Sequence, residues 1–490
     1  MKIAFKNDAK EIKGEAFFVS IGSKNNDEIV KENGVKTLYL KCDEAEKMNL
    51  RKLFLLARKM IILAKNTKIE KLTFNFNDFS TLGGSASGGK YANFGITNTE
   101  LGEIIGSQLD FANYEFTEYK TPPKEGFSFI KEIFILGASK KIQQAILKGN
   151  IIANEVNKTR SLSNMPGGDM TPQILAKKAK EAVKNLPVKV TVLGEKEMER
   201  LNMRAILSVG RGSDEESKFI IMEYRGEKSR RPKGVGIPTK ASGPIVLVGK
   251  GVTFDTGGIN LKPSNSLLGM NMDMSGGAAV IHSIALAAKM KLKKNVIGLI
   301  PAVENMTSGK SYHPGDVIRS MSGKTIEILN TDAEGRVILA DALTYAGKYN
   351  PEVVIDIATL TGAAVVALGE RASAIFTDND SLAKNLEEIG EKTGDYVWRL
   401  PMWEEYENEI KGSLGDLTNV HNKDSRYGGA IYGAIFLYQF IKGKKEGEKA
   451  PKWAHIDIAP RMTSMTGENL SQGALGTSVR LLYKFIEQYK

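Results

Sequence analysis

The chain has 490 residues, of which 42% are apolar and 26% are charged, and these proportions are ordinary for a folded globular protein. Its net charge is +11, and its single cysteine, Cys42, excludes an intrachain disulfide and a thiolate metal cluster. The start lacks the apolar run of a signal peptide and no apolar stretch is long enough to cross a bilayer, so we expect a cytoplasmic protein without a membrane partner.

The first 120 residues alternate short apolar strands with helical segments. Strands are predicted at 37–40 and 71–76, and residues 97–113 form a predicted helix because their apolar positions recur at helical spacing. Between them lies a glycine- and serine-rich segment, 83–89, which we interpret as a mobile surface loop. Phosphate binding is a weaker interpretation, because the Lys-Ser/Thr pair of a P-loop is absent.

A domain boundary is predicted near residue 163. Residues 127–136 read as a strand and 140–162 as a long helix, and Pro166-Gly167-Gly168 then interrupts the chain. Thr171-Pro172 is typical of the start of a new helix. We therefore expect a smaller N-terminal α/β domain with a linker helix, 1–163, and a larger C-terminal α/β domain, 164–490.

The second half alternates β-branched apolar runs with helical segments rich in alanine and leucine. The predicted strands are 244–248, 296–301, 325–329 and 353–358, and the predicted helices between them include 278–289 and 336–348. This alternation predicts a C-terminal domain with a central, mostly parallel (mixed) sheet. Ligand sites in such sheets form beyond the carboxyl ends of the strands.

The chemistry must come from carboxylates, lysines and arginines. The chain has four histidines, none paired at ligand spacing, and it has no Gly-x-Ser-x-Gly motif. His455 lies in an apolar run and is best interpreted as a strand histidine. A histidine-based zinc site and a Ser-His-Asp triad are both improbable.

Two segments place charged groups next to predicted strand or helix ends. Lys250, Asp255 and Lys262 lie in the glycine-rich segment 248–263, for which a hairpin with solvent-facing charges is an equally good interpretation. Asp273 lies among apolar residues in 270–277, where capping of the next helix is the stronger interpretation of that residue alone.

A third segment, 328–337, carries Asp332, Glu334 and Arg336. Capping of the next helix would explain one acid but not two. Together the three segments supply four carboxylates, which balance two divalent cations, and Lys250 could add a neutral amine ligand. With Lys262 and Arg336 as nearby cations, this is the inventory of two-metal hydrolysis.

Residues 330–336, Asn-Thr-Asp-Ala-Glu-Gly-Arg, resemble the signature of the leucyl aminopeptidase family, the two-metal cytosol aminopeptidases. Other segments resemble that family in the same order, from about Asn154 to the C-terminus: 248–263, 269–280, 304–309, 314–317, 356–362, 453–459 and 473–482. The chain differs from many relatives at Asn271, where lysine is common, and at 460–462.

The resemblance implies a leucyl (cytosol) aminopeptidase-like enzyme that acts on peptides with a free N-terminus. The implied ligands of two Zn²⁺ or Mn²⁺ ions are Lys250, Asp255, Asp273, Asp332 and Glu334. Lys262 and Arg336 take the two catalytic positions, and Arg336 would hold a bicarbonate ion. Residues implied to contact substrate are Met270, Thr359, Leu360 and Gly362. The family's usual assembly is a homohexamer.

Two other functions stay open at this point. Some bacterial relatives also bind DNA, and the net charge permits it, but the basic residues are spread along the chain and no nucleic-acid-reading motif supports it. A two-metal hydrolase could also act on phosphate esters.

Overall fold

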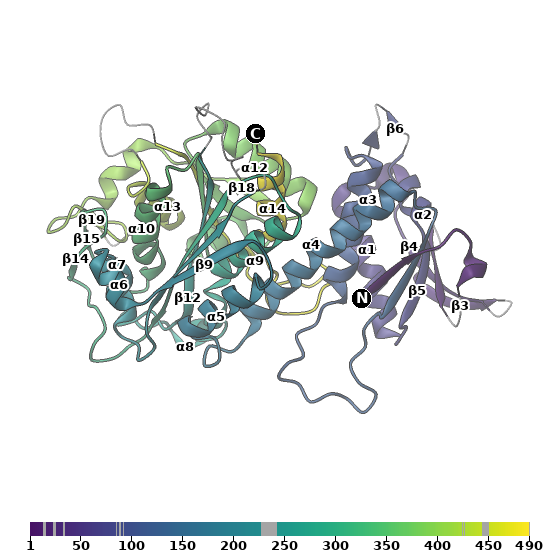
Figure 1. The fold of residues 1–490 in the computed structure, drawn as a ribbon, viewed down its shortest axis with the longest axis horizontal. Coiled ribbons are helices and arrows are strands. Elements are labelled where there is room, and N and C mark those ends of the chain that lie inside the picture. The colour runs from purple at the N-terminus through teal and green to yellow at the C-terminus, as the bar shows by residue number, and fades with distance from the viewer. Residues whose placement is uncertain are drawn as a thin grey trace, which may run out of the picture. The chain divides into compact units, whose positions relative to one another are not determined.

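The computed structural model describes residues 1–12, 16–22, 26–32, 35–84, 86–87, 90–91, 93–226, 243–423, 425, 427–442 and 450–489. The chain forms two compact units, Met1–Asn157 with Thr463–Gly473, and Lys158–Met462 with Ala474–Lys490 (Figure 1). Both units are α/β, as predicted. The predicted boundary near residue 163 lies close to the end of a helix, Lys140–Asn164, within which the two units divide. Among the described residues, no helix has the length and apolarity needed to cross a membrane.

The first unit is built on a six-stranded sheet. Its strand order is β1-β8-β5-β2-β4-β3, and neighbours are parallel except for the antiparallel pair β3–β4. The strands of the first unit are β1 (Lys2–Phe5), β2 (Phe17–Gly22), β3 (Glu28–Glu32), β4 (Val35–Lys41), β5 (Lys71–Asn75), β6 (Ala86–Ser87), β7 (Lys90–Tyr91) and β8 (Glu132–Leu136). Its helices are α1 (Leu50–Asn66), α2 (Phe76–Thr81), α3 (Asn98–Asn113) and the first part of α4 (Lys140–Asn164).

Local sequence explains where elements of this unit begin and end. Thr97 caps α3 in a capping box, in which Glu100 N donates to Thr97 Oγ1 and Thr97 N donates to the Glu100 carboxylate. The predicted strand 127–136 is wrong in its first half, since β8 begins at Glu132. The Asn113 side chain bonds both the N–H and the carbonyl of Ile130 at 2.9 Å, so this backbone is paired outside the sheet. Residues 85 and 88–89 of the predicted loop 83–89 lie outside the described residues.

The second unit contains a nine-stranded mixed sheet with the order β18-β17-β20-β16-β11-β13-β10-β9, and β12 also pairs with β13. Neighbours are parallel apart from β17–β20, β13–β10 and β10–β9, which confirms the predicted mostly parallel sheet. Its strands are β9 (Val188–Leu193), β10 (Lys218–Tyr224), β11 (Ile245–Gly249), β12 (Gly251–Asp255), β13 (Val296–Asn305), β16 (Val353–Ala358), β17 (Ser373–Phe376), β18 (Val397–Arg399) and β20 (Lys452–Asp457). A small sheet holds β14 (Val317–Arg319), β15 (Thr325–Glu327) and β19 (Leu417–Thr418).

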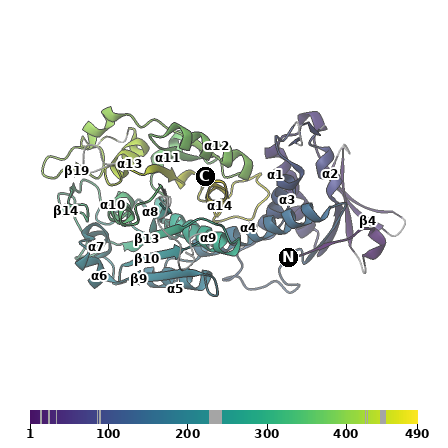
Figure 2. The same cartoon turned by 45° about the horizontal axis from the view of Figure 1, so that its top comes forward.

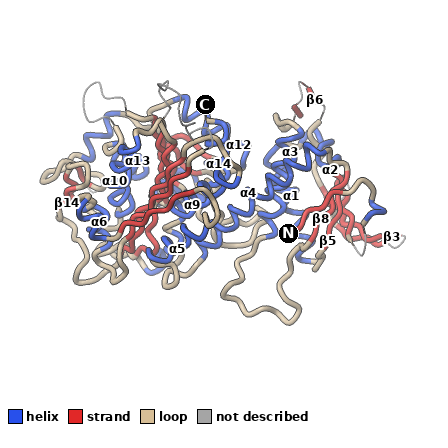
Figure 3. Tube along the Cα trace, viewed as in Figure 1, coloured by secondary structure: helices blue, strands red, loops and turns tan. Residues whose placement is uncertain are grey.

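Helices cover both faces of the large sheet (Figure 3). The core on one face includes residues of α5 (Pro172–Ala182), α9 (Ser275–Lys289), α12 (Asp380–Thr393) and α14 (Val479–Gln488). The core on the other face includes residues of α7 (Arg204–Gly210), α10 (Glu334–Ala346), α11 (Gly362–Leu368) and α13 (Gly429–Tyr438). The other α-helices in the described part of this unit are α6 (Glu195–Arg200) and α8 (Ser264–Leu267). Helices α7 and α10 lie side by side (Figures 1 and 2).

The start of α9 lies directly against the ends of two central strands. Gly277 N donates to the Lys250 carbonyl at 2.7 Å, just beyond β11. A Cβ on Gly276 would lie 2.1 Å from the carbonyl oxygen of Ile357 in β16, so a side chain there would displace the helix. The glycines in the first turn of α9 therefore bring the residues before this helix close to the strand ends.

Candidate metal centre

The predicted charged residues follow the carboxyl ends of the central strands or begin the helices next to them. Lys250 directly follows β11, and Asp255 is the last residue of β12. Asp273 ends a short 3-10 turn, Met270–Met272, just before α9, and Glu334 is the first residue of α10. Strands β11 and β12 both pair in parallel with β13, so the hairpin interpretation of 248–263 is wrong.

Three of the predicted carboxylates form one buried cluster. Asp255, Asp273 and Glu334 each offer an oxygen atom, and these oxygens lie within 4.8 Å of one another. Neither α9 nor α10 has a side-chain hydrogen bond at its N-cap, so helix capping explains neither Asp273 nor the acids at the start of α10.

Two lysines lie among these acids. Lys250 Nζ lies 2.9 Å from Asp273 Oδ2 and 2.7 Å from Glu334 Oε1. Lys262 Nζ lies 2.9 Å from Asp255 Oδ2 and also forms an ion pair with the half-buried Asp332. The side chains of the five predicted ligands and of Lys262 therefore lie next to one another in a single cluster.

Burial and crowding of like charges dominate the electrostatics. Burial raises the pKa of Asp273 and of Glu334, and the nearby Asp255 charge raises both further. Burial alone would lower the pKa of Lys250, but the Asp273, Glu334 and Asp255 charges outweigh it, so that pKa is raised. Lys250 is thus an ammonium when no metal is bound.

The residues fit divalent metal binding. Four carboxylates face two ammonium groups, so negative charge is in excess. Glu334 Oε2 is buried and has no hydrogen-bond partner among the described residues, and such an oxygen is costly unless a cation faces it. Carboxylate oxygens are the ligands that hard cations prefer.

Arg336 is buried on α10, close to the cluster. Burial lowers its pKa to about 10, although the charges of Glu334, Asp457 and Asp332 oppose this shift. Its Nε has no hydrogen-bond partner among the described residues. Helix α13 comes close to it, since a Cβ on Gly433 would lie 3.5 Å from Arg336 Nη2 and 3.1 Å from Leu360 Cδ2.

The predicted substrate residues border the cluster at several points. Thr359 Oγ1 donates to Asp273 Oδ1 at 2.6 Å, and its carbonyl accepts from Lys250 Nζ at 2.9 Å. Leu360 follows it, Gly362 is exposed at the start of α11, and Met270 is half-buried in the turn before Asp273. The side-chain amide of Asn271, in the same turn, donates to the carbonyls of Ser163 and Met165.

Sequence reasoning missed three buried residues that support the site: Asn305, Tyr312 and Asp457. Asn305 donates to Asp255 and to the Thr331 carbonyl, and Tyr312 donates to the Thr331 carbonyl. Asp457 accepts from Leu360 N at 3.0 Å and from Thr361 Oγ1 at 2.7 Å. Asn305 and Asp457 are the last residues of β13 and β20, so polar residues at strand ends were the available signal.

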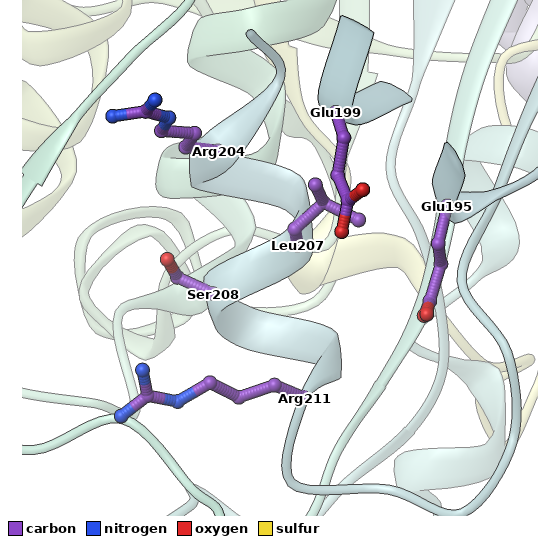
Figure 4. A pocket seen from close by; sticks show the side chains of 6 residues that line it. All are labelled: Glu195, Glu199, Arg204, Leu207, Ser208 and Arg211. Carbon is purple, nitrogen blue, oxygen red and sulfur yellow. The ribbon is translucent and has the colours of Figure 1, made fainter. Parts of the chain in front are cut away.

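A separate hollow of about 570 Å³ lies between α6 and α7 (Figure 4). It contains no predicted site residue. Its lining combines acidic and basic side chains: Glu195, Glu199, Arg204, Leu207, Ser208 and Arg211.

Comparison with known proteins identifies the family to which the chain belongs. Residues 157–483 match the sequence model of the cytosol aminopeptidase family, catalytic domain. A "Probable cytosol aminopeptidase" of Rickettsia bellii is 39% identical over 465 residues, covering 94% of this chain and 86% of that protein. Another, of Syntrophotalea carbinolica, is 40% identical over 400 residues, covering 80% of this chain and 76% of that protein.

The chain belongs to the cytosol aminopeptidase family, a family of metal-dependent peptidases. It is also similar to the solved structure of the bottromycin maturation enzyme BotP in complex with Mn, with a TM-score of 0.82 and 27% identity. That similarity covers 97% of this chain and 99% of BotP, so it includes residues of both units.

Proposed function

We propose that this protein is a cytoplasmic, leucyl aminopeptidase-like enzyme that uses two divalent cations, Zn²⁺ or Mn²⁺, to release N-terminal residues from peptides. The observation that carries the proposal is the gathering of Asp255, Asp273 and Glu334, with Lys250 and Lys262, at the strand ends. The similarity to BotP in complex with Mn supports manganese as one of the cations.

The ligand sets follow from the resemblance to the family. Lys250, Asp255, Asp273 and Glu334 would hold the tightly bound cation. Asp255, Asp332 and Glu334 would hold the exchangeable one. When bound, such cations supply Lewis acidity for the scissile carbonyl and for the attacking water.

Lys250 must change its protonation state to serve as a ligand. Its raised pKa means that Nζ carries a proton in the metal-free protein, and this proton has to leave before the nitrogen can donate its lone pair. The Thr359 carbonyl accepts from Nζ, and Thr359 Oγ1 fixes the rotation of the Asp273 carboxylate. Thr359 thus orients two ligands together.

The two catalytic positions suit different tasks. Lys262 presents an ammonium group at the edge of the cluster, where it would stabilise the negative charge that develops on the substrate carbonyl oxygen. Arg336 would hold a bicarbonate, which supplies a proton acceptor, because the guanidinium fork matches a planar carboxylate-like anion. Its Nε is free of protein partners among the described residues.

The test is hydrolysis of leucine p-nitroanilide and of its N-acetylated form by the full chain, with chelator and with added Mn²⁺ or Zn²⁺. We expect turnover of the free amine only, lost with chelator and restored by metal, and loss of turnover in Glu334→Ala. Asp341→Asn is the control, since Asp341 is a buried carboxylate on the same helix but outside the cluster, and we expect it to keep its activity. Wild-type turnover in Glu334→Ala, or hydrolysis of a phosphomonoester instead, would contradict the proposal.

A further inference from the structure

We propose that Asn305 is a positioning residue for the metal centre, holding Asp255 and the loop that carries Asp332 in one arrangement before any cation binds. This inference rests on the proposed function, because it concerns the same site. Among the described residues, the Asn305 amide bonds Asp255 and Thr331 and no predicted substrate residue, so its role is to act through Asp255 and Thr331.

The position of Asn305 follows from the sheet. It is the last residue of β13, is fully buried, and is the register partner of Asp255 across the parallel pair β12–β13. Its backbone is held as well, since the Asn305 carbonyl accepts from Thr256 N at 2.9 Å and from Thr256 Oγ1 at 2.8 Å. The Asn305 side chain therefore projects from a strand end whose backbone is held by hydrogen bonds, next to the cluster.

The amide group of Asn305 connects two separate segments of the site. Its Nδ2 donates to Asp255 Oδ1 at 2.8 Å and to the Thr331 carbonyl at 3.1 Å. Both acceptors lack hydrogens, so they determine which side of the amide carries the nitrogen. One side chain thereby uses both of its N–H groups to tie Asp255 to the residue before Asp332.

These bonds determine how the Asp255 carboxylate is turned. Asp255 Oδ1 accepts from both Asn305 Nδ2 and Gly257 N at 2.8 Å, while Oδ2 faces Lys262 Nζ. A ligand carboxylate whose rotation is already restricted loses less freedom when it binds a cation. Loss of the Asn305 amide would free this rotation.

A role in packing alone does not account for Asn305. Its Oδ1 is buried and has no hydrogen-bond partner among the described residues. An unsatisfied buried oxygen lowers stability, so an apolar side chain would pack at this position at lower cost. What asparagine adds is its two N–H groups, both of which donate to the site.

The loop around Thr331 is held by bonds to other residues as well as by Asn305. A variant of Asn305 should therefore leave the loop folded. Tyr312 OH also donates to the Thr331 carbonyl, at 2.7 Å. Thr331 N donates to Asn260 Oδ1 and Asn260 N donates to Thr331 Oγ1, both at 2.8 Å. The loop therefore keeps these bonds when Asn305 is changed, and what is lost is the connection between the loop and Asp255.

The experiment is titration of the metal-free full chain with Mn²⁺, followed by isothermal calorimetry and by electron paramagnetic resonance of the bound ion. The variants are Asn305→Ala and Asn305→Asp, the second having the same shape, neither N–H group, and a charge beside Asp255. Ser311→Ala is the matched control, because Ser311 is buried in the loop after β13 and its hydroxyl, among the described residues, bonds Met306 O and Ser308 N and no group of the cluster. Thermal unfolding of each metal-free protein is measured alongside.

We expect Mn²⁺ to bind roughly 10- to 100-fold more weakly to both Asn305 variants and with wild-type affinity to Ser311→Ala. Excess Mn²⁺ should restore much of the aminopeptidase activity of Asn305→Ala. Wild-type affinity in Asn305→Ala, an equal loss in Ser311→Ala, or failure of both Asn305 variants to fold would overturn the positioning role. If the wild-type protein itself bound no Mn²⁺, the proposed function would fail instead.

Discussion

At the scale of single residues, the site depends on close approaches that leave no space for additional atoms. Lys250 reaches Asp273 and Glu334 by passing next to Gly335 in the first turn of α10. A Cβ on Gly335 would lie 2.7 Å from Lys250 Nζ and 2.7 Å from its Cε. A side chain at this position would therefore push the end of Lys250 away from its present place between Asp273 and Glu334.

Gly335→Ala should displace Lys250 and lower kcat/KM by at least about tenfold, because small displacements of site groups are costly. Gly347→Ala is the control at the other end of the same helix, where an added Cβ would meet nothing within 4 Å. Steady-state kinetics with an aminoacyl anilide compares the two variants. Equal activity of both would show that Lys250 needs no such space.

Lys262→Gln should lower kcat by roughly 10²- to 10³-fold with a smaller change in KM, because the ammonium acts on charge that appears only in the transition state. The same anilide assay at saturating metal measures both constants. A change confined to KM would instead assign Lys262 to ground-state binding.

At the scale of elements, the first backbone N–H groups of helix α7 are bonded by a side chain of another helix. Its N-cap, Met203, makes no side-chain cap bond, and Asp341 of α10 accepts from Ala205 N at 2.9 Å and Ile206 N at 3.1 Å. Asp341 also accepts from Met321 N at 2.7 Å. Burial nevertheless raises the pKa of Asp341 to about 7, although these three bonds oppose the shift.

This raised pKa predicts a pH dependence of stability. The folded state holds a proton on Asp341 that the unfolded state releases near pH 4, so the free energy of unfolding should fall as pH rises from about 4 to 7. The slope should be on the order of 1 kcal/mol per pH unit. Denaturant unfolding of the metal-free wild type and of Asp341→Asn tests this prediction. The free energy of unfolding of the wild type, relative to that of Asp341→Asn, should fall as pH rises from about 4 to 7. A difference that does not vary with pH would refute the shift.

Much of the element order could be predicted because it depends on local patterns. Apolar runs predicted β5, β11, β13 and β16, and Thr171-Pro172 predicted the start of α5. The strand before α4 was predicted too long, because the competing Asn113 bonds come from a distant segment. Pairing of β11 and β12 with β13 is equally non-local, which is why a hairpin was an equally good interpretation of 248–263.

The charged residues of the candidate site could be predicted from the sequence, and the neutral residues that bond them could not. Its charged residues stand in recognisable segments. Asn305 and Thr331 lie in two of these segments, 304–309 and 330–336, but the type of a neutral residue does not tell which group it bonds. Asn305, Tyr312 and Thr331 are single neutral residues whose partners lie far away in the sequence. Only the folded chain reveals that they bond the ligand-bearing segments.

At the scale of the whole molecule, we propose from the resemblance to the family that the chain forms a homohexamer. Several large apolar side chains are strongly exposed in the single chain, among them Leu268 at 92% and Val366 at 90%. Surfaces of this kind gain from burial in an assembly.

Light scattering coupled to size exclusion should give a mass of about six 53.6 kDa chains. A single-chain mass at micromolar concentration would contradict the proposed hexamer without affecting the account of the metal site.

The central claim is that the acidic cluster and Lys250 bind a pair of cations. Anomalous diffraction from crystals of the full chain grown with Mn²⁺ tests it most directly. We predict two manganese peaks, one beside Lys250, Asp255, Asp273 and Glu334 and one beside Asp255, Asp332 and Glu334. Peaks elsewhere, or no peak among these side chains, would contradict the account.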